Sequence, residues 1–112
     1  MSVREIPTRE WPAFLDQLGR EHRAWLATVE RSGVAEARDQ PLESISVAGA
    51  IDIRIGSRAI RVDEPLAVRV EETAEGGVQA VQIDDATGRR VTLRFRVAVA
   101  PGALDGLAPS ER

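Results

Sequence analysis

The chain has no cysteine, lysine, tyrosine or asparagine, and His22 is its only histidine. Without cysteine, neither a disulfide nor a thiolate metal site can form. A zinc site built on His22 would need carboxylates for its other ligands, which is an unusual set. The residues that most often carry catalysis are nearly absent, so we expect no cofactor and a protein that acts through a surface rather than a reactive side chain.

Long apolar runs are also missing. No stretch approaches the roughly 18 apolar residues of a membrane span, and the first residues contain no run typical of a secretory signal. We therefore expect a cytoplasmic protein that does not contact membranes. The net charge is −3, whereas nucleic-acid binders usually carry a basic excess, so nucleic acid is an unlikely partner.

What remains is the composition of one small globular domain. Of the 112 residues, 43% are hydrophobic and 29% are charged, and this balance excludes a disordered chain. We expect a single helix-plus-antiparallel-sheet domain over residues 1–100. The segment 101–112, with its prolines and glycines, is typical of a C-terminal tail.

An amphipathic helix is predicted near the start of the chain. Thr8 can cap it, and Gly19 weakens its C-terminal end, where His22 and its arginine neighbours suit the helix dipole. Large apolar residues recur at i, i+3, i+4 and i+7. They are Trp11, Phe14, Leu15 and Leu18. This stripe should cover one end or face of a sheet.

From Trp25 onward, apolar and polar residues alternate in short runs separated by turns, which predicts antiparallel strands. Pro41 and Pro65 cannot donate to a strand ladder, so each should mark a bend. The predicted fold class is α+β, mostly β, with the helix followed by a strongly bent antiparallel meander of five or six strands. The meander could close into a small barrel or stay a curled sheet. The predicted strands cover 25–30, 34–47, 51–55, 59–71, 78–83 and 91–97.

Several stretches resemble a bacterial family of small proteins that is known only as a domain of unknown function. They are residues 11–15, 22–30, 36–43, the strand that ends at Ile83, and 93–96. The resemblance implies the domain boundaries given above and brings no catalytic residues. The helix followed by bent strands is also similar in topology to Sm-like barrels, which are RNA-binding ring proteins. Sm-like proteins often bind RNA through asparagine, which this chain lacks, and topology alone does not establish function.

Two polar sites need a structural and a functional interpretation. His22 is interpreted as a helix-end cation or as a packed imidazole bonded to a backbone carbonyl, with a catalytic or metal-binding role as the alternative. Asp84 and Asp85 could form an acid–base pair or a cation site, but they lack the spacing of a calcium loop. Because aspartate is frequent in turns, we interpret them as a hairpin tip.

Arginines alternate with acids along the predicted strands. The default interpretation is a solvated face of cross-strand ion pairs with Asp52, Asp63, Glu71 and Glu72. The alternative is a cluster without acidic partners in the last hairpin, which would bind an anion or an acidic protein. That candidate interaction surface consists of Arg89, Arg90, Arg94 and Arg96.

The four aromatic residues are expected in the core, since each lies on an apolar face by its spacing. They are Trp11, Phe14, Trp25 and Phe95. Their burial would remove the exposed rings on which single-stranded nucleic acids stack.

The leading functional hypothesis is a non-enzymatic protein-interaction module that acts through a sheet edge or the arginine-rich hairpin, with an unidentified protein or a second copy as partner. A small-ligand-binding barrel is an alternative, and it would require an apolar cavity near Trp25 and Phe95. A third is an Sm-like RNA-binding assembly that uses Arg94 and Arg96. An enzyme is the least favoured class.

Overall fold

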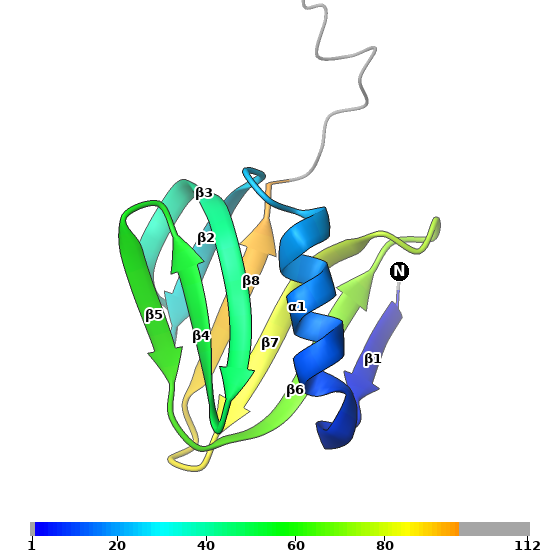
Figure 1. Ribbon diagram of the computed structural model, residues 1–112, viewed down its shortest axis with the longest axis vertical. Helices are drawn as coiled ribbons and strands as arrows, with labels where there is room; N and C mark the ends of the chain where they lie inside the picture. The colour runs from blue at the N-terminus through cyan, green and yellow to red at the C-terminus, as the bar shows by residue number, and fades with distance from the viewer. Residues whose placement is uncertain (1, 97–112) are drawn as a thin grey trace, which may run out of the picture.

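In the described part of the chain, a short strand comes first, and one α-helix and seven further strands follow it (Figure 1). The computed structural model describes residues 2–96. The elements are β1 (Ser2–Ile6), the 3-10 turn η1 (Thr8–Glu10), α1 (Trp11–Glu21), β2 (Leu26–Arg31), β3 (Val34–Ala48), β4 (Ala50–Ile55), β5 (Arg58–Val62), β6 (Pro65–Glu72), β7 (Val78–Asp85) and β8 (Arg90–Phe95). All strand pairs are antiparallel. The prediction of a mostly β, α+β fold with one N-terminal helix is confirmed.

The helix presents the predicted apolar stripe to the interior. Trp11, Leu15 and Leu18 are buried, and Phe14 is half-buried. The predicted cap at Thr8 is wrong, because Thr8 begins the 3-10 turn and α1 starts at Trp11 without a side-chain cap. The indole N–H of Trp11 instead donates to the Ile6 carbonyl, 2.8 Å away, and so ties the start of the helix to the end of β1.

Residues 2–96 form eight strands, more than the five or six predicted. β1 was missed because Ile6 is the only buried residue among its five, so the alternation that marks a half-buried strand is absent. The predicted strand 59–71 is in fact two strands, β5 and β6. They separate around Glu64, whose positive φ of 50° turns the chain just before Pro65.

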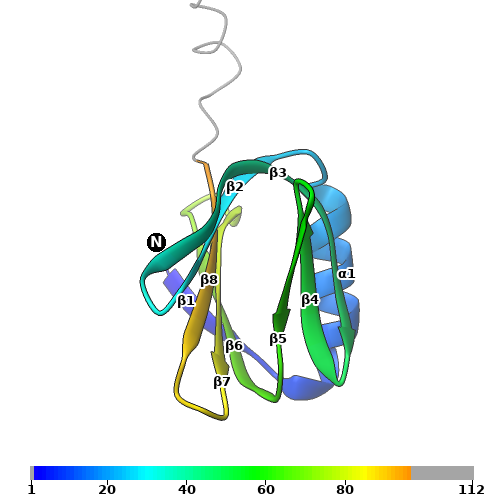
Figure 2. The ribbon, with the colours of Figure 1, turned by 90° about the vertical axis from the view of Figure 1, so that its left-hand side faces the viewer.

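The sheet is open and does not close into a barrel. Its strand order is β1-β6-β7-β8-β2-β3-β4-β5, which leaves β1 and β5 as the edges within the described residues. The long strand β3 bends the sheet, so that β4 and β5 lie opposite β6, β7 and β8 (Figure 2). Pro41 does not interrupt β3, because the register with β2 shifts near it and Asp39 adopts a positive φ of 51°.

One core fills the space between the two halves of the bent sheet and extends to the helix. Its largest fully buried side chains come from both halves and from α1, and they include Leu15, Leu42, Ile51, Ile53, Ile55, Ile83 and Leu93. The helix packs mainly along the second half of β3. It comes so close at Gly19 that an added Cβ would lie 2.9 Å from the backbone nitrogen of Ile45.

The predicted tail, 101–112, and the last residue of the predicted final strand, Val97, lie outside the described residues. Residues 2–96 contain no helix that is both long and apolar enough to cross a lipid bilayer.

Candidate functional site

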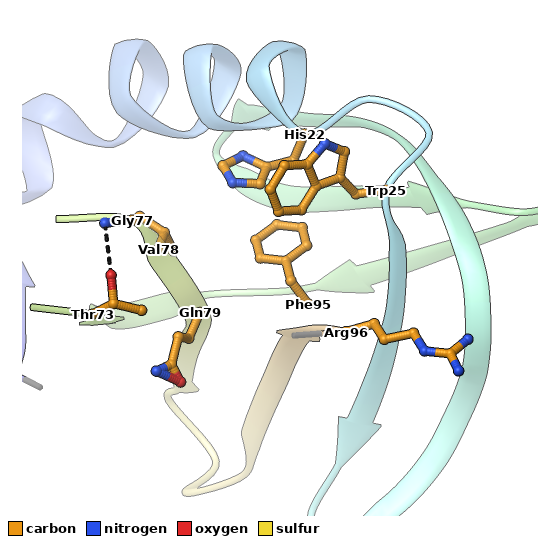
Figure 3. Close-up of a pocket in the computed structure, with 8 residues that line it drawn as sticks. All are labelled: His22, Trp25, Thr73, Gly77, Val78, Gln79, Phe95 and Arg96. Carbon is orange, nitrogen blue, oxygen red and sulfur yellow. Dashed lines mark hydrogen bonds between the residues drawn. The ribbon is translucent and has the colours of Figure 1, made fainter. Parts of the chain in front are cut away.

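An apolar pocket of about 210 Å³ opens where the end of α1, the chain leading into β2, the end of β8 and the β6–β7 hairpin meet (Figure 3). Its walls are His22, Trp25, Thr73, Gly77, Val78, Gln79, Phe95 and Arg96. The pocket therefore joins the first third of the chain to the last described residues. No local sequence motif spans it.

Three rings form one side of the pocket. The His22 imidazole stacks on Phe95 with centroids 4.3 Å apart and an interplanar angle of 18°. Trp25 meets His22 edge-on at 4.5 Å and Phe95 edge-on at 6.0 Å, and rings that pack this way attract one another. Phe95 is 2% exposed and Trp25 is 41% exposed. Phe95 thus belongs to both the core and the pocket, whereas Trp25 forms an open wall.

The prediction that Trp25 lies in the core is wrong. Strand β2 begins one residue later, because Ala24 adopts a left-handed backbone with φ of 72° and reverses the chain after the helix. Backbone hydrogen bonds fix this reversal. Ala24 N–H donates to the Leu42 carbonyl at 2.7 Å, Trp25 N–H donates to His22 at 3.0 Å, and Leu42 N–H donates to Trp25 at 2.9 Å. The exposed indole is consequently mounted on a firmly held backbone.

His22 is a packed imidazole bonded to a backbone carbonyl, as predicted. It is 8% exposed, and its Nδ1 lies 2.9 Å from the Leu18 carbonyl oxygen, one helical turn earlier. Among residues 2–96, its other ring nitrogen, Nε2, has no hydrogen-bond partner in the protein. Within the same residues, no three acidic or histidine side chains gather as metal ligands.

The remaining polar groups shape the rim. Thr73 N–H donates to the Gly77 carbonyl at 2.8 Å, and the Thr73 hydroxyl oxygen accepts from Gly77 N–H at 3.1 Å, so the hairpin tip is closed on itself. Gln79 of β7 and Arg96, which follows β8, complete the lining, and their side chains point away from the three rings (Figure 3). Arg96 N–H is bonded to Leu26, which holds this end of β8 beside β2.

Comparison with known proteins places almost the whole chain in one family. A family model described as a family of unknown function (DUF5335) matches residues 2–104. The chain belongs to this family. The pocket lies entirely within the matched range, and the resemblance to a domain of unknown function is confirmed. No curated protein and no solved structure matches the chain.

The arginine residues of the last hairpin have different surroundings. Arg90 pairs with Asp84 at 2.7 Å, and Arg94 pairs with Glu71 at 3.3 Å. Arg89 and Arg96 have no carboxylate within 4.0 Å among the described residues. Because its two middle members are neutralised, the predicted surface of Arg89, Arg90, Arg94 and Arg96 is not a continuous cluster of unpaired cations.

The default interpretation of the sheet surface, cross-strand ion pairs, holds for Asp52, Glu71 and Glu72, whereas Asp63 pairs with Arg61 two residues before it and not across strands. Each acid named for it contacts an arginine. The pairs are Arg61 with Asp52 and Asp63, Arg94 with Glu71, and Arg4 with Glu72. Exposed ion pairs contribute little stability singly. These pairs give the outer face of the sheet a polar surface and do not indicate a binding site.

Asp84 and Asp85 form the predicted hairpin tip. The Asp85 carboxylate accepts hydrogen bonds from the Thr87 hydroxyl at 2.7 Å and from the backbone N–H groups of Thr87 and Arg89, both at 2.9 Å. The Asp84 carboxylate is bonded to Arg90 and to Arg69. Asp85 Oδ1 therefore holds the turn closed, and Asp84 links the hairpin to the neighbouring strand β6 through Arg69.

These hydrogen bonds make the folding stability of the protein depend on pH in the acid range. The bond from Arg90 is the main cause that lowers the pKa of the Asp84 carboxyl below its ordinary value of 3.8, and the bond from the Thr87 hydroxyl does the same for the pKa of Asp85. The unfolded chain then binds more protons, so the stabilisation is complete above the ordinary pKa and is lost as pH falls through the lower folded values.

We expect the melting temperature to drop below pH 3.8. In circular dichroism melts, the double variant Asp84→Asn/Asp85→Asn should start less stable and show a flatter acid decline. If the double variant loses stability in acid as steeply as the natural chain does, other carboxyl groups cause the acid dependence.

Proposed function

We propose that this protein is a non-enzymatic protein-interaction module whose binding site is the aromatic pocket, rather than a sheet edge or the arginine-rich hairpin. One observation carries the proposal: an apolar pocket in which the half-exposed Trp25 stands beside the buried Phe95. Aromatic residues in a partly open pocket are typical of the few positions that supply most of the energy in protein interfaces.

The size of the pocket favours an anchor side chain over a free ligand. Sites for drug-sized molecules usually enclose about 300–1,000 Å³, and this pocket holds about 210 Å³. One large apolar side chain fits such a volume.

The site is also rigid before anything binds. Trp25 is held by backbone hydrogen bonds on both sides and by ring contacts with His22 and Phe95. A preformed wall reduces the ordering cost that binding would otherwise carry.

The surroundings of the pocket favour binding over catalysis. His22 is the only lining residue that ordinarily exchanges a proton near neutral pH, and the Thr73 hydroxyl already bonds to its own hairpin. Covalent catalysis needs a nucleophile within reach of a base, and the described lining residues supply no such pair.

Selection from a random peptide library on the natural chain tests the proposal. We expect the selected peptides to share one large apolar residue and to bind the Trp25→Ala variant at least about tenfold more weakly, which is the loss typical of an interface anchor. The matched control is Leu66→Ala, which removes another exposed apolar side chain, 64% exposed, at the far end of β6. Peptides that bind Trp25→Ala as well as the natural chain would place the site elsewhere.

A further inference from the structure

We infer that the pocket is built for an aromatic side chain that carries a hydrogen-bond donor, a tyrosine or tryptophan of the partner, whose O–H or N–H donates to Nε2 of His22. This inference rests on the proposed function and specifies its ligand. It follows from the state of the histidine, from its burial and from the shape of the pocket, in three steps.

The contact with Leu18 fixes which nitrogen of His22 carries the proton. A carbonyl oxygen can only accept a hydrogen bond, so Nδ1, 2.9 Å from the Leu18 oxygen, must be the donor. In the neutral imidazole the proton is then on Nδ1, and Nε2 presents a lone pair. The group that faces a ligand is therefore an acceptor.

The histidine that carries this acceptor is a buried residue, and the acceptor has no partner in the described part of the chain. His22 is 8% exposed and lines the pocket, and within residues 2–96 nothing donates to its Nε2. Figure 3 shows the second ring nitrogen on the side of the imidazole turned toward Val78. Buried polar atoms in proteins are nearly always hydrogen-bonded, so a donor from a ligand would complete what the protein leaves open. An occupant without a donor would cover the lone pair and leave it unsatisfied.

The surrounding walls select an aromatic group to carry that donor. Trp25 and Phe95 present rings, and Val78 closes the opposite side. Rings pack favourably on such surfaces at an offset or edge-on. Phenol and indole combine a flat apolar body with one hydrogen-bond donor at the edge. The body would pack against the apolar walls, and the donor would reach the unpartnered Nε2.

Small probes test the inference on the full chain. At about pH 8.5, p-cresol and toluene are added in increasing amounts while the His22 ring nitrogens are followed by ¹⁵N NMR. We expect p-cresol to bind about tenfold more tightly than toluene, the worth of one neutral hydrogen bond, and to shift the Nε2 resonance. In His22→Phe, which keeps a stacked ring but no nitrogen, toluene should still bind and the preference for p-cresol should vanish. If this variant fails to fold, the comparison on the natural chain decides alone.

The outcomes separate this inference from the proposed function. Equal affinity for p-cresol and toluene would overturn the claim that the ligand donates a hydrogen bond to His22, while the proposal of an apolar anchor site would stand. Binding of neither probe would overturn the inference whatever the peptide selection yields. Selected peptides should contain tyrosine or tryptophan at the anchor, and Tyr→Phe in such a peptide should weaken binding by about the same tenfold. Tight binding of p-cresol without enrichment of these residues would point to a free phenol and overturn the assignment to a partner side chain.

Discussion

Replacing Gly19 with valine is expected to lower the free energy of unfolding by about 3 kcal/mol, the upper part of the usual range for overpacking. This loss should occur although valine favours helices more than glycine does. Gly19 lies on the face of α1 that packs against β3, and an added Cβ would meet the backbone nitrogen of Ile45 at 2.9 Å and its Cγ1 at 3.5 Å. The nearest atom is backbone, held in the β3–β4 ladder through the pairing of Ile45 with Ile53, so it cannot move aside as a flexible side chain would.

Urea denaturation of graded variants checks this close approach. Gly19→Ala should lower the free energy of unfolding by about 1 kcal/mol. The gain in helix propensity is about 1 kcal/mol, and the cost of the clash should exceed it. Gln17→Ala is the matched control, since Gln17 is exposed on the same helix and its replacement should leave stability nearly unchanged. If Gly19→Ala were more stable than the natural chain, the helix would be free to move away from β3, and the packing at this position would be looser than the structure indicates.

The helix and most strands could be predicted because their periodicity survives in the sequence. The stripe from Trp11 to Leu18 and the alternation in Ile51–Ile55 record burial on one face. β1 carries no such record, because it is an edge strand with one buried residue and forms by pairing with β6, more than sixty positions away. The open sheet likewise depends on how far β3 bends, which local sequence does not specify.

The candidate site could be predicted only in part. The small-ligand-binding alternative required an apolar cavity near Trp25 and Phe95, and both residues line the pocket. The exposure of Trp25 could not be predicted, because alternation assigns it to the strand and only the left-handed turn at Ala24 removes it. The opposite wall, Gly77 and Val78, reaches the pocket through tertiary packing of the β6–β7 hairpin, which leaves no signal beside His22.

Phe95 and Trp25 touch the same pocket, yet we expect their removal to have very different effects on stability. Phe95→Ala should lower the free energy of unfolding by about 3–5 kcal/mol, because it deletes a fully buried ring and leaves a cavity. Trp25→Ala should lose only about 1 kcal/mol, since much of that ring already faces solvent. Urea denaturation followed by circular dichroism measures both. Phe95→Leu, which keeps an apolar side chain in place, should fall between the two.

The contrast between these two variants decides what Trp25 is for. The Trp25 indole stays 41% exposed although its backbone is fixed by hydrogen bonds on both sides, and it lines the pocket. If Trp25→Ala proves nearly as stable as the natural chain and loses peptide binding, the exposed ring serves recognition. If it destabilises the protein as much as Phe95→Ala does, Trp25 is a core residue in solution, the pocket has no open aromatic wall, and the proposed function loses the observation on which it rests.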